Sequence, residues 1–165
     1  MSLFSNVDFS AVNRDEHILP HIRNDAWFQQ AAAERTMSEL TELKERMDGF
    51  DDRRLQIIQG LASLLARQPR ILSRPMSVDR SRELAKVRGE AYQLRRRLSD
   101  AYDSFLRDSY RRYLAPDTGC EVRDALVQEM RKNLIGRFES IVRPDVKKCL
   151  DTIDAFIRRC QAAEK

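Results

Sequence analysis

Glycine, proline and aromatic residues are scarce in this sequence. Its 165 residues include five glycines and five prolines, and 7% of its side chains are aromatic. With so few glycines, the chain has no Gly-rich loop to hold a phosphate group and no dinucleotide fingerprint. The scarcity of turn-forming residues, together with 34% charged residues, is typical of an all-α soluble protein.

Cysteine and histidine are also rare, which argues against disulfide and metal chemistry. The three cysteines, Cys120, Cys149 and Cys160, are an odd number without C-x-x-C spacing, so we interpret them as small buried hydrophobic residues. His17 and His21 are four residues apart, but Pro20 interrupts the helix that would bring them together. A metal site would still need a third ligand. We therefore expect no metal and no cofactor.

Long apolar runs are absent. No stretch approaches the ~20 consecutive apolar residues that cross a membrane. The N-terminus lacks the basic-then-apolar order of a secretory signal peptide. We therefore expect a cytoplasmic protein without a transmembrane segment.

A catalytic constellation is missing as well. Carboxylates are numerous, but nothing in the sequence places a pair of them in an apolar setting. General acid–base catalysis needs groups with shifted pKa values, which such a setting would supply. We therefore expect a protein that is not an enzyme and has no small-molecule substrate.

What the sequence does contain is a long apolar seam at helical spacing between residues 79 and 114. The apolar residues recur in steps of three and four without an intervening proline: Leu84, Val87, Ala91, Leu94, Leu98, Ala101 and Phe105. At 1.5 Å per residue, a helix over this segment is roughly 54 Å long and needs long helical partners. After Phe105 the apolar positions shift to Leu106 and Tyr110, which predicts a local change of supercoil and of packing partners.

Residues 25–67 supply one such partner, a helix that ends or kinks at Gly49. Its second half is apolar around much of its girth because Ile57 and Leu64 widen the stripe, so we expect it to be central. The inner face that we predict for this half consists of Leu55, Ile58, Leu61, Ala62 and Leu65.

Residues 118–162 supply the other partner, which begins at a cap on Asp117 or Thr118. Pro144 either kinks this segment or starts a new helix there. The inner face of its first half is predicted to consist of Val122, Leu126, Met130, Ile135 or Leu134, Phe138, Ile141 and Val142.

Together these segments predict an elongated, antiparallel all-α helical bundle. It has three long helical segments, two of them broken, which makes about five helices. Pro69 and Pro75 predict a connecting loop over residues 68–78. Residues 1–24 lack sustained periodicity and form an N-terminal arm, while residues 25–165 form a single helical-bundle domain.

The charge is divided unevenly along the chain. Residues 1–52 carry 5 basic and 11 acidic side chains, whereas residues 53–97 carry 12 basic and 3 acidic side chains. The acidic first helix can lie against the basic region and neutralise it, or an acidic patch of one subunit can meet a basic patch of another. Alternatively, the basic region is a surface for phosphate groups.

Local sequence distinguishes paired arginines from free ones. Asp103 with Arg107, and Asp108 with Arg112, have the acid-first spacing of four that favours ion pairs on a helix. The arginines in and beside the proline loop lack such local partners, and Arg96 points away from the apolar seam. The predicted anion-binding or partner-binding residues are therefore Arg67, Arg70, Arg74, Arg80, Arg82 and Arg96.

Long antiparallel helices with short connections leave no deep pocket, and such surfaces mostly recognise macromolecules. The leading interpretation is a non-enzymatic helical protein–protein interaction module, an adaptor or an assembly subunit, with a protein partner or self-association along the long helix. The alternative is a nucleic-acid-binding accessory protein that uses the basic region 53–97.

Overall fold

The computed structural model describes residues 26–114 and 122–164, and every regular element in these ranges is a helix. The elements are α3 (Ala26–Leu72), α4 (Val78–Phe105), η1 (Leu106–Tyr110), α5 (Arg111–Leu114), α6 (Ala125–Arg137), η2 (Phe138–Val142) and α7 (Arg143–Ala163). The two segments labelled η are single π-helical stretches. The predicted all-α architecture is therefore confirmed.

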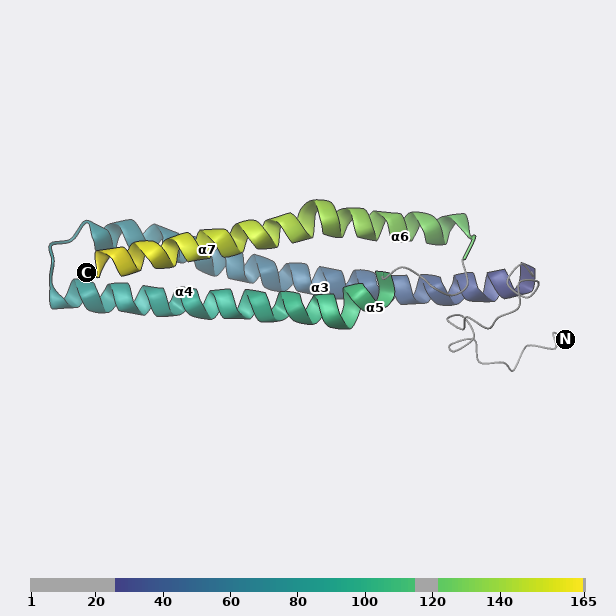
Figure 1. Cartoon of the computed structure of the whole chain (residues 1–165), viewed down its shortest axis with the longest axis horizontal. Coiled ribbons are helices and arrows are strands. Elements are labelled where there is room, and N and C mark those ends of the chain that lie inside the picture. The colour runs from purple at the N-terminus through teal and green to yellow at the C-terminus, as the bar shows by residue number, and fades with distance from the viewer. Residues whose placement is uncertain (1–25, 115–121, 165) are drawn as a thin grey trace.

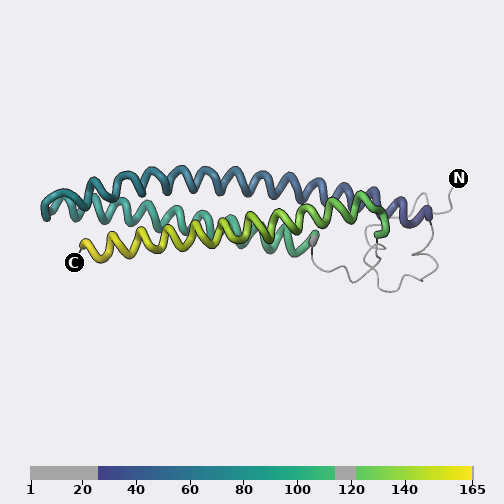
Figure 2. Tube along the Cα trace, turned by 90° about the horizontal axis from the view of Figure 1, so that it is seen from above, coloured from purple at the N-terminus to yellow at the C-terminus, as the bar shows by residue number. Residues whose placement is uncertain are grey.

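The helices form three long rods that lie side by side in an elongated bundle (Figures 1 and 2). The first rod is α3, the second is α4–η1–α5 and the third is α6–η2–α7. The second rod is antiparallel to the other two, so α3 and α7 run in the same direction (Figure 1). α4 packs extensively on both α3 and α7, whereas α3 and α7 meet one another over less of their length.

α3 continues through Gly49 without a break, so the break predicted at this residue is wrong. The neighbouring Met47 is fully buried and Phe50 is almost fully buried in the core. Glycine costs roughly 1 kcal/mol relative to alanine inside a helix. Burial of the apolar side chains on both sides of Gly49 outweighs this local preference.

α3 also continues past Pro69 and ends at Leu72, so the predicted loop over residues 68–78 shortens to residues 73–77. Proline removes a single backbone hydrogen bond from a helix. On either side of it, Gln68 and Ile71 are buried, and the Gln68 amide donates to the backbone carbonyl of Phe156 at 3.0 Å. These tertiary contacts hold the last turn of α3 in helical conformation.

The second rod changes its helical geometry where the apolar seam shifts. α4 ends at Phe105 and the π-helix η1 begins at Leu106. A π-turn holds more residues than an α-turn, so the residues after it reach the core face later in the sequence than the α-helical spacing predicts. This delay suits a seam that moves to Leu106 and Tyr110, both of which are partly buried against the core.

The same change of geometry removes the ion pairs predicted from spacings of four in this region. Asp103 and Arg107 do not lie within 4 Å of one another, and neither do Asp108 and Arg112. Instead, the Arg107 Nε lies 3.1 Å from Asp108 Oδ1, and the Arg112 guanidinium lies 5.4 Å from the centre of the Tyr113 ring. Side chains four residues apart face one another only in a regular α-helix.

The third rod starts later than the sequence predicts. Residues 122–124 are not helical, and α6 begins at Ala125. The Asp124 carboxylate caps it by accepting hydrogen bonds from the backbone N–H groups of Leu126, at 2.9 Å, and Val127, at 3.1 Å. The predicted caps at Asp117 and Thr118 lie outside the described residues.

Pro144 lies in the first turn of α7, directly after η2, and the rod does not reverse there. The first turn of a helix tolerates proline because its N–H groups have no helical partner. The buried face of the third rod also differs from the prediction. Val127, Leu134, Phe138 and Val142 are buried, whereas Leu126 is 69% exposed and Ile141 is 53% exposed.

Cys149 and Cys160 are free and buried, as predicted. Burial raises the pKa of both thiols, which keeps them protonated at neutral pH. The N-terminal arm 1–24, His17, His21 and Cys120 lie outside the described residues. Within the described ranges, no helix combines the length and the apolar character needed to cross a membrane.

Candidate interaction surface

The acidic half of α3 does not cover the basic region, so this predicted mode of neutralisation is wrong. Arg46 of that half donates to the backbone carbonyl of Asp108 in η1 at 3.2 Å, and Asp48 pairs with Arg137 of α6. These contacts place residues 26–52 at the end of the bundle that is far from the 73–77 loop (Figure 1). The basic side chains around that loop are therefore open to other partners or to nearby acids.

Three of the six predicted arginines are paired with carboxylates of α4. Arg67 pairs with Glu90 and Arg74 pairs with Glu83, each at 2.8 Å. Arg96 lies 3.8 Å from Asp100, with both side chains largely exposed. The first two partners lie 23 and 9 residues along the chain, so local spacing does not reveal them. Exposed pairs of this kind contribute less than about 1 kcal/mol each.

Arg80 is not a surface residue at all, since only 8% of it is exposed. One of its terminal nitrogens lies 3.4 Å from the backbone carbonyl of Ala163, at the C-terminal end of α7. A cation is favourable at that end of a helix because the last carbonyls are unpaired and carry partial negative charge. Arg80 therefore braces α7 against α4 and is not available to an external anion.

Arg70 and Arg82 are the remaining predicted residues. Both are exposed, and neither forms an ion pair or a side-chain hydrogen bond within the described parts of the chain. Of the six candidates, these two retain unsatisfied charge. The structure thus narrows the predicted basic surface to one arginine near the end of α3 and one in the second turn of α4.

The inner face predicted for the second half of α3 is wrong, because four of its five residues, all except the buried Leu61, form an apolar stripe on the outside of the helix. Leu55 is 51% exposed, Ile58 38% and Leu65 39%, and Ala62 between them is exposed as well. Steps of three, four and three residues place these four side chains on one face of the helix. We call Leu55, Ile58, Ala62 and Leu65 the α3 stripe.

The core takes a neighbouring face of the same helix. Ile57, Leu61 and Leu64 are buried, in steps of four and three that are as regular as those of the α3 stripe. In a bundle of three rods, α3 has only two neighbours and buries only one face. The second half of α3 therefore has more apolar residues than its one buried face can hold, and the remaining ones lie on the surface. This excess of apolar residues is the sequence feature by which the stripe could have been found.

A groove between α3 and α7 runs beside the α3 stripe. Leu65 lines it on the α3 side, while Pro144, Lys148, Thr152 and Ala155 line it on the α7 side. It is open to solvent and has a volume of about 500 Å³. Its lining combines apolar surface with a basic rim, which suits a helix or an extended segment of another protein.

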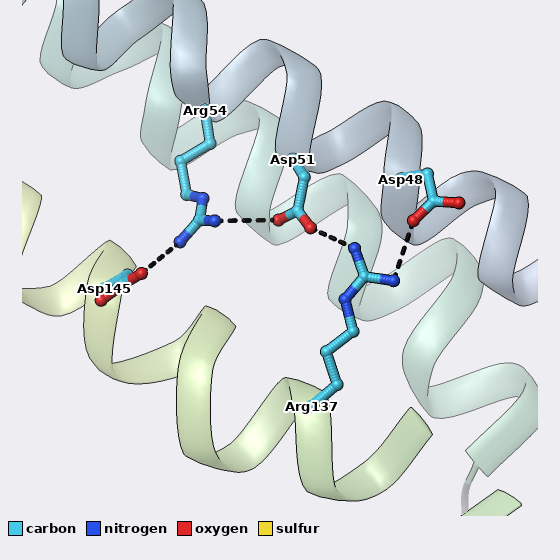
Figure 3. Close-up of polar contacts among 5 residues, drawn as sticks. All are labelled: Asp48, Asp51, Arg54, Arg137 and Asp145. Atoms are coloured by element: carbon cyan, nitrogen blue, oxygen red, sulfur yellow. Dashed lines mark hydrogen bonds and ion pairs between the residues drawn. The ribbon is translucent and has the colours of Figure 1, made fainter. Parts of the chain in front are cut away.

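An ionic cluster locks α3 to the third rod next to this surface (Figure 3). Arg137 of α6 bridges Asp48, at 2.8 Å, and Asp51, while Arg54 bridges Asp51, at 3.2 Å, and Asp145, at 2.7 Å. Burial lowers the pKa of Arg137, but its hydrogen bonds to the two aspartates outweigh this effect and raise the pKa overall. These charges are therefore used within the chain.

Two of the tyrosines of the second rod serve packing. Tyr102 and Tyr110 stack on Phe138, with ring centres 6.2 and 4.0 Å apart. The Tyr110 hydroxyl donates to Glu139 at 2.9 Å, and burial together with this carboxylate raises the pKa of Tyr110 to about 12. Rings that are engaged in this way are not free to stack on nucleotide bases.

Within the described ranges, no group of three or more His, Cys, Asp or Glu side chains converges in a way that could hold a metal ion. Comparison of the whole chain with protein-family models, with curated proteins and with solved structures gave no match.

Proposed function

We propose that this protein is a non-enzymatic helical protein-interaction module, an adaptor or a subunit of an assembly. The observation that carries the proposal is the α3 stripe, which leaves three large aliphatic side chains in water beside an open groove. Burying a large aliphatic side chain contributes about 1.5–3 kcal/mol, so a partner that covers the stripe gains several kcal/mol.

Capture experiments with matched variants test this proposal. Proteins retained by the wild-type chain are identified, purified and titrated against Ile58→Glu, Leu65→Glu and a control variant, Leu126→Glu. Leu126 is 69% exposed and lies in the first turn of α6. This turn is at the end of the bundle that is far from the 73–77 loop (Figure 1). We expect the two stripe variants to bind at least about tenfold more weakly and the control to bind like the wild type. Equal binding by all variants would contradict the proposal.

A second candidate function is nucleic-acid binding by the basic region, and the unpaired, exposed Arg70 and Arg82 favour it. Phosphate-driven binding weakens strongly between about 50 and 200 mM salt. Fluorescence anisotropy of labelled DNA and RNA over this range tests it, with Arg70→Glu/Arg82→Glu as the variant. The control is Arg123→Glu, a reversal in the segment before α6. Binding that does not change with salt concentration, or that the double variant retains, would rule this candidate out.

A further inference from the structure

We propose that the partner of the α3 stripe is a second copy of this chain, docked antiparallel along α3 about a two-fold axis near residue 60. This inference rests on the proposed function, because it uses the same stripe and names its occupant. The structure supports it through the order of charges along α3, the spacing of two unpaired residues and the position of the stripe between them.

The charge of α3 changes sign where the stripe begins. Residues 26–52 contain seven acidic and three basic side chains, whereas residues 53–72 contain four arginines and no acidic residue. The exposed apolar side chains occupy the middle of the helix, at residues 55–65. The acidic half of one α3 therefore meets the basic half of another when the two helices lie antiparallel with their stripes in contact.

The stripe is also self-complementary about its own centre. In an antiparallel pair of helices, residues whose numbers add up to about 120 lie opposite one another when the axis passes near residue 60. Leu55 then faces the partner's Leu65, and Ile58 faces the partner's Ala62. Two leucines thus meet at each end of the stripe, whereas an isoleucine meets an alanine near the axis. The two stripes can therefore interlock.

Asp52 and Arg70 flank the stripe on opposite sides of this axis, eight and ten residues from it. They are 18 residues apart, which is five turns at 3.6 residues per turn, so they lie on the same side of the helix. Both are exposed, and neither forms an ion pair or a side-chain hydrogen bond among the residues that the structure describes. In the proposed dimer Asp52 lies beside the partner's Arg70, and the two-fold axis forms this pair twice.

Other occupants satisfy these charges less well. A parallel copy would place Asp52 beside the partner's Asp52 and Arg70 beside the partner's Arg70, which is repulsive in both places. An acidic foreign helix would pair with Arg70 but would meet Asp52 as a like charge. Of these three occupants, only the antiparallel copy neutralises both residues. The 18 residues between Asp52 and Arg70 span about 27 Å of helix, a contact length that suits one helix pair. Because a single helix pair is a small interface, we expect the dimer to dissociate on dilution.

Sedimentation equilibrium of the full chain over a range of concentrations tests the inference. The wild type should approach twice the monomer mass of 19.3 kDa, with a dissociation constant that rises with salt. Asp52→Arg and Arg70→Asp should each weaken dimerisation about tenfold, since each change makes two attractive pairs repulsive. The double variant Asp52→Arg/Arg70→Asp should regain wild-type affinity, and an equimolar mixture of the two single variants should dimerise better than either alone.

The control is Arg97→Asp, an exposed charge reversal on α4 that should leave the mass distribution unchanged. Far-UV circular dichroism of each variant checks that the helices remain folded. A wild type that stays monomeric at all concentrations, or single variants that are not rescued by the charge swap, would overturn the inference. Neither result affects the proposed function, which is decided separately by the loss of captured partners in Ile58→Glu and Leu65→Glu.

Discussion

Replacing Gly49 by alanine should stabilise the protein. Gly49 lies in the middle of the 47-residue helix α3, is exposed, and has no positive backbone φ angle. A Cβ atom built at this residue meets nothing within 4 Å. Alanine therefore keeps every contact of the native structure and removes the conformational freedom that glycine has in the unfolded chain.

The expected gain is about 0.8–1 kcal/mol in the free energy of unfolding, the difference in helix propensity between the two residues. For a chain of this size, such a gain raises the Tm by about 2–4 °C. Thermal and urea unfolding followed by circular dichroism at the helical band measures both quantities. The slope of the urea transition should not change, because the surface exposed on unfolding stays the same.

Gly60→Ala is the matched comparison on the same helix. The new Cβ there would lie 3.3 Å from Leu94 Cδ2, so the propensity gain is offset by crowding and the net change should be close to zero. A Gly49→Ala variant that is less stable than the wild type would refute the reasoning. It would mean that the chain breaks at Gly49, as local sequence rules predict, and that α3 is not continuous.

Three further predictions concern the packing between rods. Arg54→Ala should destabilise the fold by about 2 kcal/mol in urea unfolding, because it leaves the carboxylates of Asp51 and Asp145 without their shared cation; an unchanged midpoint would show that the cluster adds nothing. Phe138→Ala should cost about 3–5 kcal/mol by the same assay, because this ring is fully buried and contacts Phe105 and Tyr110 of the second rod. A loss below about 1 kcal/mol would contradict this packing. Tyr110 should ionise near pH 12 in a spectrophotometric titration. Because its folded pKa lies above the unfolded value of 10, its stabilising contribution is complete below pH 10 and is lost as the pH rises towards 12. Ionisation near pH 10 would show that its contact with the third rod is not formed.

Much of α4 could be predicted from sequence because its apolar residues allow only one register. Leu84, Val87, Ala91 and Leu98 are all fully buried, as the steps of three and four predict. The polar residues between them leave no competing face, so the helical period alone selects the core. The shift after Phe105 also marked the start of the π-helix, because a change of phase in the sequence requires a change of turn in the structure.

The second half of α3 could not be assigned in the same way. Two sets of apolar residues there have equally regular spacings: the buried Ile57, Leu61 and Leu64, and the exposed α3 stripe. The two sets lie on neighbouring faces of the same helix. The choice between them is made by the number of neighbours, since α3 contacts α4 on one side and the third rod on the other. No local pattern carries that information.

The arginines illustrate a second limit. Arg67 finds its partner on another helix, and Arg80 is held at the end of α7, 83 residues along the chain. A search for an acidic residue four positions before each arginine treats both as free. Arg70 and Arg82 are the two for which the local reasoning and the tertiary structure agree.

The two π-helices lie beside one another, since Tyr110 at the end of η1 stacks on Phe138 at the start of η2 with ring centres 4.0 Å apart. A π-turn is equivalent to one residue inserted into an α-helix, and the faces on either side keep their phase. Relatives of this chain that are one residue shorter in either rod should therefore align with a gap at 106–110 or 138–142 and nowhere else in these helices. At this level of the bundle each of these two rods holds one residue more than an α-helix of the same length would. It is therefore the place where the chain can gain or lose single residues without rotating its core.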